Sequence, residues 1–245
     1  MLERDGFVVF DRDAGVRAWA KAAYRVACGI ADDPQMQARN LRHGKTWFVG
    51  VDALPNKADG SVNGVPLNGP WQAHVPDVPL HSAQLSIIYP GYPQRDPDQS
   101  AANHRYRVTR AAAHVDGLLP EGPMRRRYAR EFHAYILGLP LNALRSAPTV
   151  VWPGSHVIMQ QALVEAIGDH PVGDVDFTDA YQAARRVVFD TCAPVPIIAE
   201  PGQAFVIHRF ALHGTAVWDA PAIGPGRMIA FFRPEFANPQ DWLAH

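Results

Sequence analysis

The chain has 245 residues, of which 47% are hydrophobic and 19% are charged, so it can bury a core and does not have the composition of a disordered protein. Its formal net charge of −1 argues against nucleic acid or a membrane surface as the main partner. The N-terminus resembles no signal peptide, no run of about 18 apolar residues occurs, and Cys28 and Cys192 lack a metal-type spacing, so we expect a cytoplasmic protein.

The first half of the chain predicts alternating strand, helix and loop. Residues 5–11 (DGFVVFD) predict a short strand, and residues 13–34 predict a helix, because apolar residues recur at helical spacing until a proline closes the segment. Residues 52–79 are rich in Gly, Pro, Asn and Asp and predict a loop. Residues 83–93 predict a strand that runs into a turn, and the polar residues 94–107 predict a mobile surface loop.

The second half consists of short apolar segments separated by turns, which is typical of β structure. Ser155 is predicted to cap a helix at about 156–168, and Thr178 a second helix at 179–190. The predicted strands lie in 110–117 (RAAAHVDG), 131–141 (EFHAYILGLPL), 147–156 (APTVVWPGSH), 194–218 (two strands around the turn Pro201–Gly202) and 227–236 (RMIAFFRPEF).

Many short strands with Gly and Pro turns predict a closed or two-sheet β architecture. The chain shows no internal repeat and no linker, so we expect one domain over residues 1–245. It also shows no βαβ rhythm and neither GxGxxG nor GxxxxGK[ST], which argues against a nucleotide-binding α/β fold.

His114 and Asp116 lie two residues apart in the predicted strand 110–117, so their side chains should point to the same face. An imidazole nitrogen and a carboxylate oxygen suit a divalent first-row metal, and a second imidazole would complete a facial triad with three open positions. The alternative interpretation is a hydrogen-bonded histidine at a strand end followed by an aspartate that opens a turn.

The segment 205–218 (FVIHRFALHGTAVW) supplies two candidates for the second imidazole, His208 and His213. They are five residues apart and would face opposite sides of a regular strand. We choose His213, because the following Gly214 lets the backbone come close to a bound centre. His208 is expected to be a supporting or surface residue.

Arg227 opens the last predicted strand. Its planar fork can bind the far carboxylate of a dicarboxylic cosubstrate in bidentate fashion. Arg233 is the competitor, since it lies six residues further along with the same strand parity. A solvated arginine at a strand start is the alternative interpretation of Arg227.

Three segments together resemble the phytanoyl-CoA dioxygenase family of iron(II)/2-oxoglutarate-dependent oxygenases. HVDG (114–117) resembles its proximal HxD motif, and LPLNALRSAPTVVWPGSH (139–156) resembles its stretch leading to PGSH. EPGQAFVIHRFALHGT (200–215), together with Arg227, resembles its distal histidine and its 2-oxoglutarate arginine. The N-terminal DGFVVF matches its opening strand, and the resemblance covers roughly residues 80–236.

The resemblance implies a mainly β fold, a cupin-like double-stranded β-helix or jelly roll with flanking α-helices. It implies that the proposed triad holds Fe(II), that Arg227 holds the C5 carboxylate of 2-oxoglutarate, and that Thr215 places a hydroxyl near that carboxylate. With O₂ as second cosubstrate, such an enzyme hydroxylates a small molecule. Halogenating relatives lack the carboxylate ligand, so Asp116 favours hydroxylation.

Other segments are expected to be structural. Trp47, Phe48 and Trp218 are interpreted as packing residues rather than pocket walls, and Arg125–Arg127 as a solvated turn rather than a contact for an anionic substrate. The 94–107 loop and the 156–190 insertion receive no role.

Two other functions fit the same residues: a metal-binding jelly-roll protein that is a sensor, storage or accessory module, and a metal-dependent isomerase or hydrolase. Turnover without O₂ would exclude the oxygenase. Substrate identity and oligomeric state are left open by the sequence.

Overall fold

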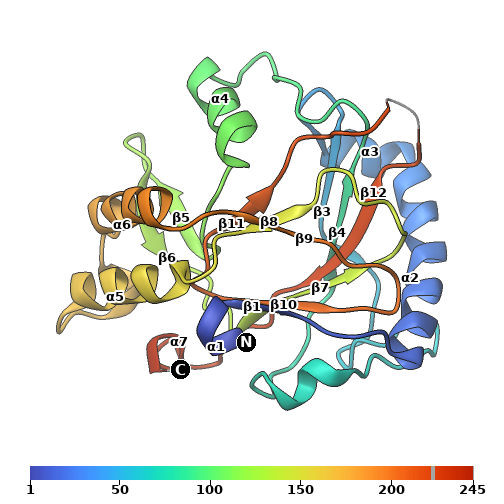
Figure 1. The fold of residues 1–245 in the computed structure, drawn as a ribbon, viewed down its shortest axis with the longest axis horizontal. Helices are drawn as coiled ribbons and strands as arrows, with labels where there is room; N and C mark the ends of the chain where they lie inside the picture. Colours follow the sequence, from blue (N-terminus) through green and yellow to red (C-terminus); the bar gives the residue numbers. More distant parts are fainter. Residues whose placement is uncertain (222–223, 245) are drawn as a thin grey trace.

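The core of the molecule consists of two antiparallel β-sheets that face each other (Figure 1). The computed structural model describes residues 1–221 and 224–244. Within these residues the strands are β1 (Phe7–Val9), β2 (Leu41–Arg42), β3 (Trp47–Leu54), β4 (Ala83–Ile88), β5 (Leu118–Glu121), β6 (Arg126–Ala129), β7 (Tyr135–Pro140), β8 (Thr149–Val151), β9 (Val195–Ile197), β10 (Phe205–His208), β11 (His213–Thr215) and β12 (Arg227–Phe232). The large sheet has the order β1-β10-β7-β12-β4-β3-β2 and the small sheet the order β11-β8-β9, while β5 and β6 form a hairpin.

Apolar side chains from both sheets meet between them. Ile136 of β7 and Ile229 of β12 belong to the same buried cluster as Val151 of β8 and Ile197 of β9. From β7 to β12 the chain passes back and forth between the sheets, with β7, β10 and β12 in the large sheet and β8, β9 and β11 in the small one, as in a jelly roll. The predicted mainly β, double-stranded β-helix fold with flanking helices is therefore confirmed.

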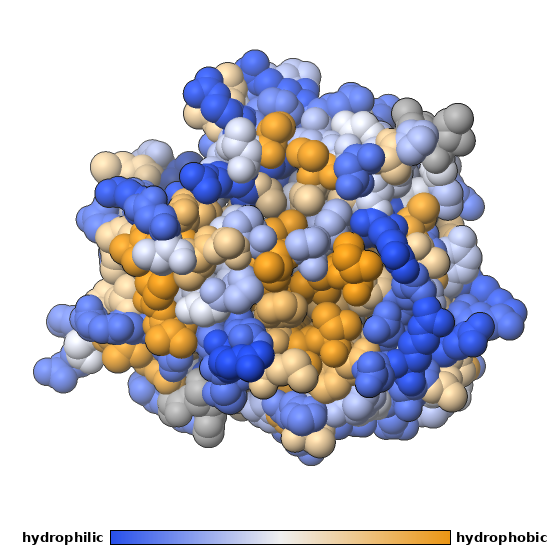
Figure 2. Space-filling view, in the orientation of Figure 1, coloured by the Kyte–Doolittle hydropathy of each residue, from blue (hydrophilic) through white to orange (hydrophobic). Residues whose placement is uncertain are grey.

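Helices lie outside the sheets. They are α1 (Leu2–Asp5), α2 (Ala14–Asp32), α3 (Pro34–Asn40), α4 (Ala101–Arg110), α5 (Ser155–Ile167), α6 (Thr178–Thr191) and α7 (Asp241–Ala244), with 3₁₀ turns at Pro70–Ala73 and Val172–Asp174. None of the helices in the described ranges has both the length and the apolar character needed to span a bilayer. Figure 2 shows apolar residues gathered over α5 and α6, where Val157, Val164 and Val187 are exposed.

The helix α2 covers the outer face of the large sheet. Asp13 caps its start, because its carboxylate accepts a hydrogen bond from the Val16 amide at 2.9 Å. The helix then buries Trp19 against Phe232, with ring centroids 5.9 Å apart. Pro34 does not simply close this helix, as the sequence suggested; it is the first residue of α3.

The predicted loop at 94–107 is wrong for its second half, which forms α4. Ser100 caps this helix by accepting a hydrogen bond from the Asn103 amide at 3.1 Å. The helix buries no residue completely, so its sequence carries no apolar stripe that would have revealed it.

The two predicted helix caps are also wrong. The α5 helix begins at Ser155 itself, after Gly154 in a left-handed conformation. The Ser155 hydroxyl accepts a hydrogen bond from the Leu212 amide at 2.9 Å instead of capping the helix. The α6 helix begins at Thr178, whose amide donates to the Asp176 carboxylate at 2.9 Å. Ser155 therefore ties α5 to the segment that leads into His213.

The basic run 125–127 is only partly a turn. Arg125 has a positive φ of 51° in the turn, but Arg126 and Arg127 belong to β6. Arg126 pairs with Asp176, and the guanidinium of Arg127 lies over the Tyr181 ring, 5.0 Å from its centroid. These arginines attach the hairpin to α6, so the solvated-turn interpretation fails for them.

Candidate metal centre

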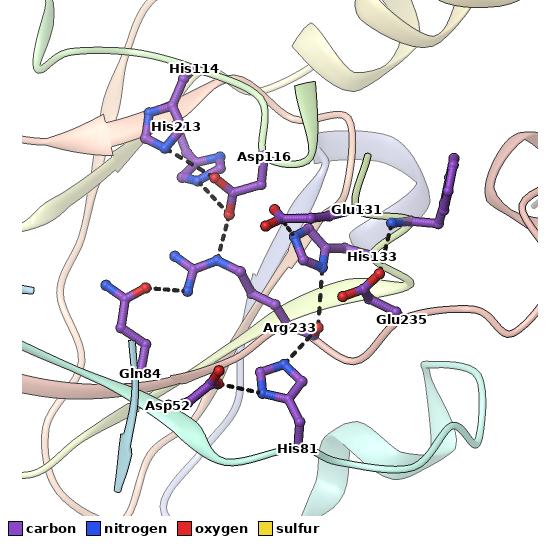
Figure 3. A network of polar contacts seen from close by, with 11 residues as sticks. Asp52, His81, Gln84, His114, Asp116, Glu131, His133, His213, Arg233 and Glu235 are labelled. Atoms are coloured by element: carbon purple, nitrogen blue, oxygen red, sulfur yellow. Dashed lines mark hydrogen bonds and ion pairs between the residues drawn. The ribbon is translucent and has the colours of Figure 1, made fainter. Parts of the chain in front are cut away.

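The structure brings His114, Asp116 and His213 together at one point (Figure 3). Each residue offers one ligand atom, and the three atoms lie within 4.8 Å of one another. The two imidazole centroids are 4.7 Å apart. All three residues line a cavity of about 1000 Å³. The grouping predicted from the sequence thus exists in space, next to room for a substrate.

A single β-bridge positions the two histidines. His114 is not part of a regular strand, so the strand predicted at 110–117 is wrong; instead it pairs with His213 through backbone hydrogen bonds of 2.8 and 3.0 Å. Gly214 permits this approach, because a Cβ there would lie 2.2 Å from the Ala111 carbonyl oxygen. Position 214 therefore requires a small residue, as the sequence predicted. The atom that a side chain there would meet belongs to the backbone of Ala111 and not to a bound centre.

Both imidazoles are held in the same tautomer by backbone carbonyls. The Nδ1 atom of His114 lies 3.0 Å from the Ala112 oxygen, and that of His213 lies 2.9 Å from the Ala211 oxygen. Since a carbonyl only accepts, each Nδ1 carries the proton and each Nε2 presents a lone pair. Within the described residues, His213 Nε2 is buried and has no hydrogen-bond partner.

The Asp116 carboxylate faces these lone pairs. Its Oδ1 lies 3.1 Å from His114 Nε2, and its Oδ2 lies 3.7 Å from His213 Nε2. Burial raises the pKa of Asp116, but the positive charge of Arg233 lowers it, and the pKa lies well below its usual range. Three lone-pair groups therefore converge, and a cation between them would remove their repulsion.

Arg227 is placed differently from the expectation. It is almost fully buried, and within the described residues its Nε and Nη1 atoms have no hydrogen-bond partner. Burial lowers its pKa to about 10, against the opposing effect of Tyr92, so the guanidinium stays charged at neutral pH. It lines a separate cavity of about 10 Å³ with Asn142 and Phe205, not the cavity of the triad.

Arg233, the competitor, does line the triad's cavity. Its Nε donates to Asp116 Oδ2 at 2.5 Å, and its Nη1 donates to Gln84 Oε1 at 2.7 Å (Figure 3). The two arginines thus differ: Arg233 has partners on the cavity wall, whereas two buried donors of Arg227 find no partner among the residues that the structure describes.

Two threonines face each other beside the triad. Thr215, the predicted hydroxyl, pairs in register with Thr149 across β11 and β8, and both line the cavity. Within the described residues, the buried Oγ1 of Thr149 has no partner. Sequence reasoning missed Thr149, although its position on an apolar strand was a possible signal.

The aromatic residues divide between core and cavity. Phe48 is fully buried in the core, as expected, but its neighbour Trp47 lines the cavity and donates from Nε1 to Ser86 Oγ at 3.0 Å. Trp47 and Trp218 also pack, as expected, against the buried cluster of Ile88, Tyr92 and Ala147, so Trp47 is both a packing residue and part of the cavity wall. His208 lies away from the triad, buried with its ring 5.0 Å from that of His156, so it is not a surface residue.

Comparisons with known proteins give a structural likeness. No protein-family model and no curated protein matches the chain. The non-heme alpha-ketoglutarate-dependent carbocyclase SnoK from nogalamycin biosynthesis matches 94% of this chain and 79% of its own, at 14% identity and a TM-score of 0.52. EctD from S. alaskensis, crystallised with 2-oxoglutarate and 5-hydroxyectoine, matches 95% of this chain and 73% of its own, at 16% identity and a TM-score of 0.48. The likeness to SnoK shows a shared fold.

Proposed function

We propose that this chain is a non-haem iron oxygenase that uses Fe(II), 2-oxoglutarate and O₂ to hydroxylate a small molecule. The observation that carries the proposal is the convergence of lone pairs from His114 Nε2, His213 Nε2 and Asp116 on the wall of a cavity of about 1000 Å³. Two imidazoles and one carboxylate leave three positions on an iron ion, enough for a bidentate cosubstrate and O₂. The shared fold with SnoK, an alpha-ketoglutarate-dependent enzyme, supports the proposal.

Arg227 is the residue to which we assign the far carboxylate of 2-oxoglutarate. A buried guanidinium with unused donors is costly, and a carboxylate would satisfy it with charge-assisted hydrogen bonds. Arg233 suits this role less, because Asp116 and Gln84 already occupy two of its donors. Cosubstrate binding then requires the small cavity beside Arg227 to open into the large one.

Bound iron would supply the oxidative chemistry. The chain itself fixes the tautomer of both histidines through the Ala112 and Ala211 carbonyls, and it keeps Asp116 ionised. Apolar side chains on the cavity wall, among them Val49, Leu80 and Phe231, would limit the access of water to the reacting centre.

The test is formation of succinate from 2-oxoglutarate, with Fe(II) and O₂ present and a small-molecule library as substrate source. We expect O₂-dependent succinate in the wild-type protein and a loss of at least about 100-fold in Asp116→Ala, since removal of a ligand from the triad disables the iron. Asp190→Ala, an exposed carboxylate on α6, is the matched control and should leave the rate unchanged. Substrate turnover that continues without O₂ would instead favour isomerase or hydrolase chemistry.

A further inference from the structure

Arg233 makes a contact that the proposed function does not use. Its side chain lies between Asp116 and Gln84 on the cavity wall (Figure 3). It comes from just beyond the end of β12, whereas Asp116 precedes the β5–β6 hairpin, so the contact joins segments 117 residues apart. The guanidinium also packs on Phe231, 5.4 Å from its ring centroid.

The backbone of Arg233 is fixed as firmly as its side chain. Its carbonyl oxygen lies 2.9 Å from His81 Nε2 and 3.1 Å from His133 Nδ1. Each histidine also contacts a carboxylate through its other ring nitrogen, His81 with Asp52 at 3.2 Å and His133 with Glu131 at 3.1 Å. Both the backbone and the side chain of Arg233 are thus held by contacts within the protein.

The two oxygens of Asp116 have different nearest partners. Oδ2 accepts from Arg233 Nε at 2.5 Å and lies further, 3.7 Å, from His213 Nε2, while Oδ1 lies 3.1 Å from His114 Nε2. We propose that Arg233 is a positioning residue that holds Oδ2 and leaves Oδ1 to bind the metal, so that Asp116 coordinates through one oxygen. This inference rests on the proposed metal site and adds a residue that orients one of its ligands.

Two effects of Arg233 on metal affinity have opposite signs. Its positive charge repels a cation, whereas its hydrogen bond fixes the orientation of the Asp116 carboxylate. Since groups that orient a metal ligand typically contribute about 10–100-fold to metal affinity, the positioning effect should be the larger one. The sign of the measured change therefore separates a positioning residue from one that competes with the metal for Asp116.

The experiment measures the dissociation constant of Co(II), an O₂-stable probe, by calorimetry and by the visible absorption of the bound ion. We expect Arg233→Gln to weaken binding about 10–100-fold, and its melting temperature without metal, lowered by the loss of a partner for Asp116, shows whether the variant is folded. Arg233→Lys, whose ammonium can still reach Asp116, should recover part of the affinity. Arg186→Gln removes an exposed arginine on α6 and should bind Co(II) like the wild type.

Unchanged or tighter Co(II) binding in folded Arg233→Gln would overturn the inference. The double variant His114→Ala/His213→Ala, measured in parallel, separates this failure from failure of the proposed function. If the double variant loses Co(II) while Arg233→Gln does not, only the role of Arg233 is wrong. If the double variant itself retains Co(II), the triad is not the metal site and both proposals fail.

Discussion

The Nδ1 atoms of His114 and His213 decide what the candidate site can bind. Each donates a hydrogen bond to the carbonyl oxygen two residues earlier in the chain, so the same type of hydrogen bond orients both rings. The sequence predicts which residues form the triad, because the HxD spacing and the HGT segment are visible in it. It does not reveal the carbonyl acceptors, because these depend on backbone conformation rather than on side-chain identity.

Gly214 gives a residue-scale prediction. An alanine Cβ would meet the Ala111 carbonyl oxygen at 2.2 Å, so β11 must shift away from the segment that carries His114. We expect Gly214→Ala to lower the free energy of unfolding by about 1–3 kcal/mol and to weaken Co(II) binding. Urea titration and calorimetry measure the two effects.

Gly29→Ala is the matched control for that substitution. Gly29 lies in α2, and a Cβ there meets nothing within 4 Å, so alanine should be neutral or slightly stabilising. Wild-type stability and metal affinity in Gly214→Ala would show that the close approach of β11 does not hold the histidines together.

At the scale of elements, the sequence predicts the helices and strands whose apolar pattern is unambiguous. The strands β4, β7, β10 and β12 form the middle of the large sheet, and their continuous apolar runs made them visible. The helix α4 was missed because it is polar throughout, and β3 because its aromatic residues were interpreted outside any strand. The Arg233–Asp116 contact could not be predicted, since it joins positions 117 residues apart.

At the scale of the whole molecule, burial of ionisable groups links the fold to pH. His208 lies beneath α5, away from the cavity, and burial lowers its pKa from 6.5 to about 3, with Arg209 adding to the effect. Below pH 6.5, His208 therefore binds a proton in the unfolded chain but stays neutral in the folded chain until the pH approaches about 3. Its contribution to stability is full above pH 6.5 and is lost as the pH falls toward about 3.

Replacement of this histidine tests the linkage. His208→Asn keeps an acceptor for the Phe210 amide, which donates to His208 Nδ1 at 3.2 Å. We expect the plot of unfolding free energy against pH to be shallower near pH 5 by about 1.4 kcal/mol per pH unit, the value for one proton. The measurement is urea denaturation of the metal-free protein at several pH values, and identical slopes in both proteins would contradict a neutral buried His208.

The most direct test of the central claim is an anaerobic titration of the wild-type protein with Fe(II) and then with 2-oxoglutarate. If the triad holds iron and the keto acid chelates it, as we propose, the complex would show a visible charge-transfer band. The account predicts this band at one equivalent of Fe(II), its absence in the double variant His114→Ala/His213→Ala, and a weaker apparent affinity for 2-oxoglutarate in Arg227→Gln. Tight Fe(II) binding without a band on addition of 2-oxoglutarate would contradict it.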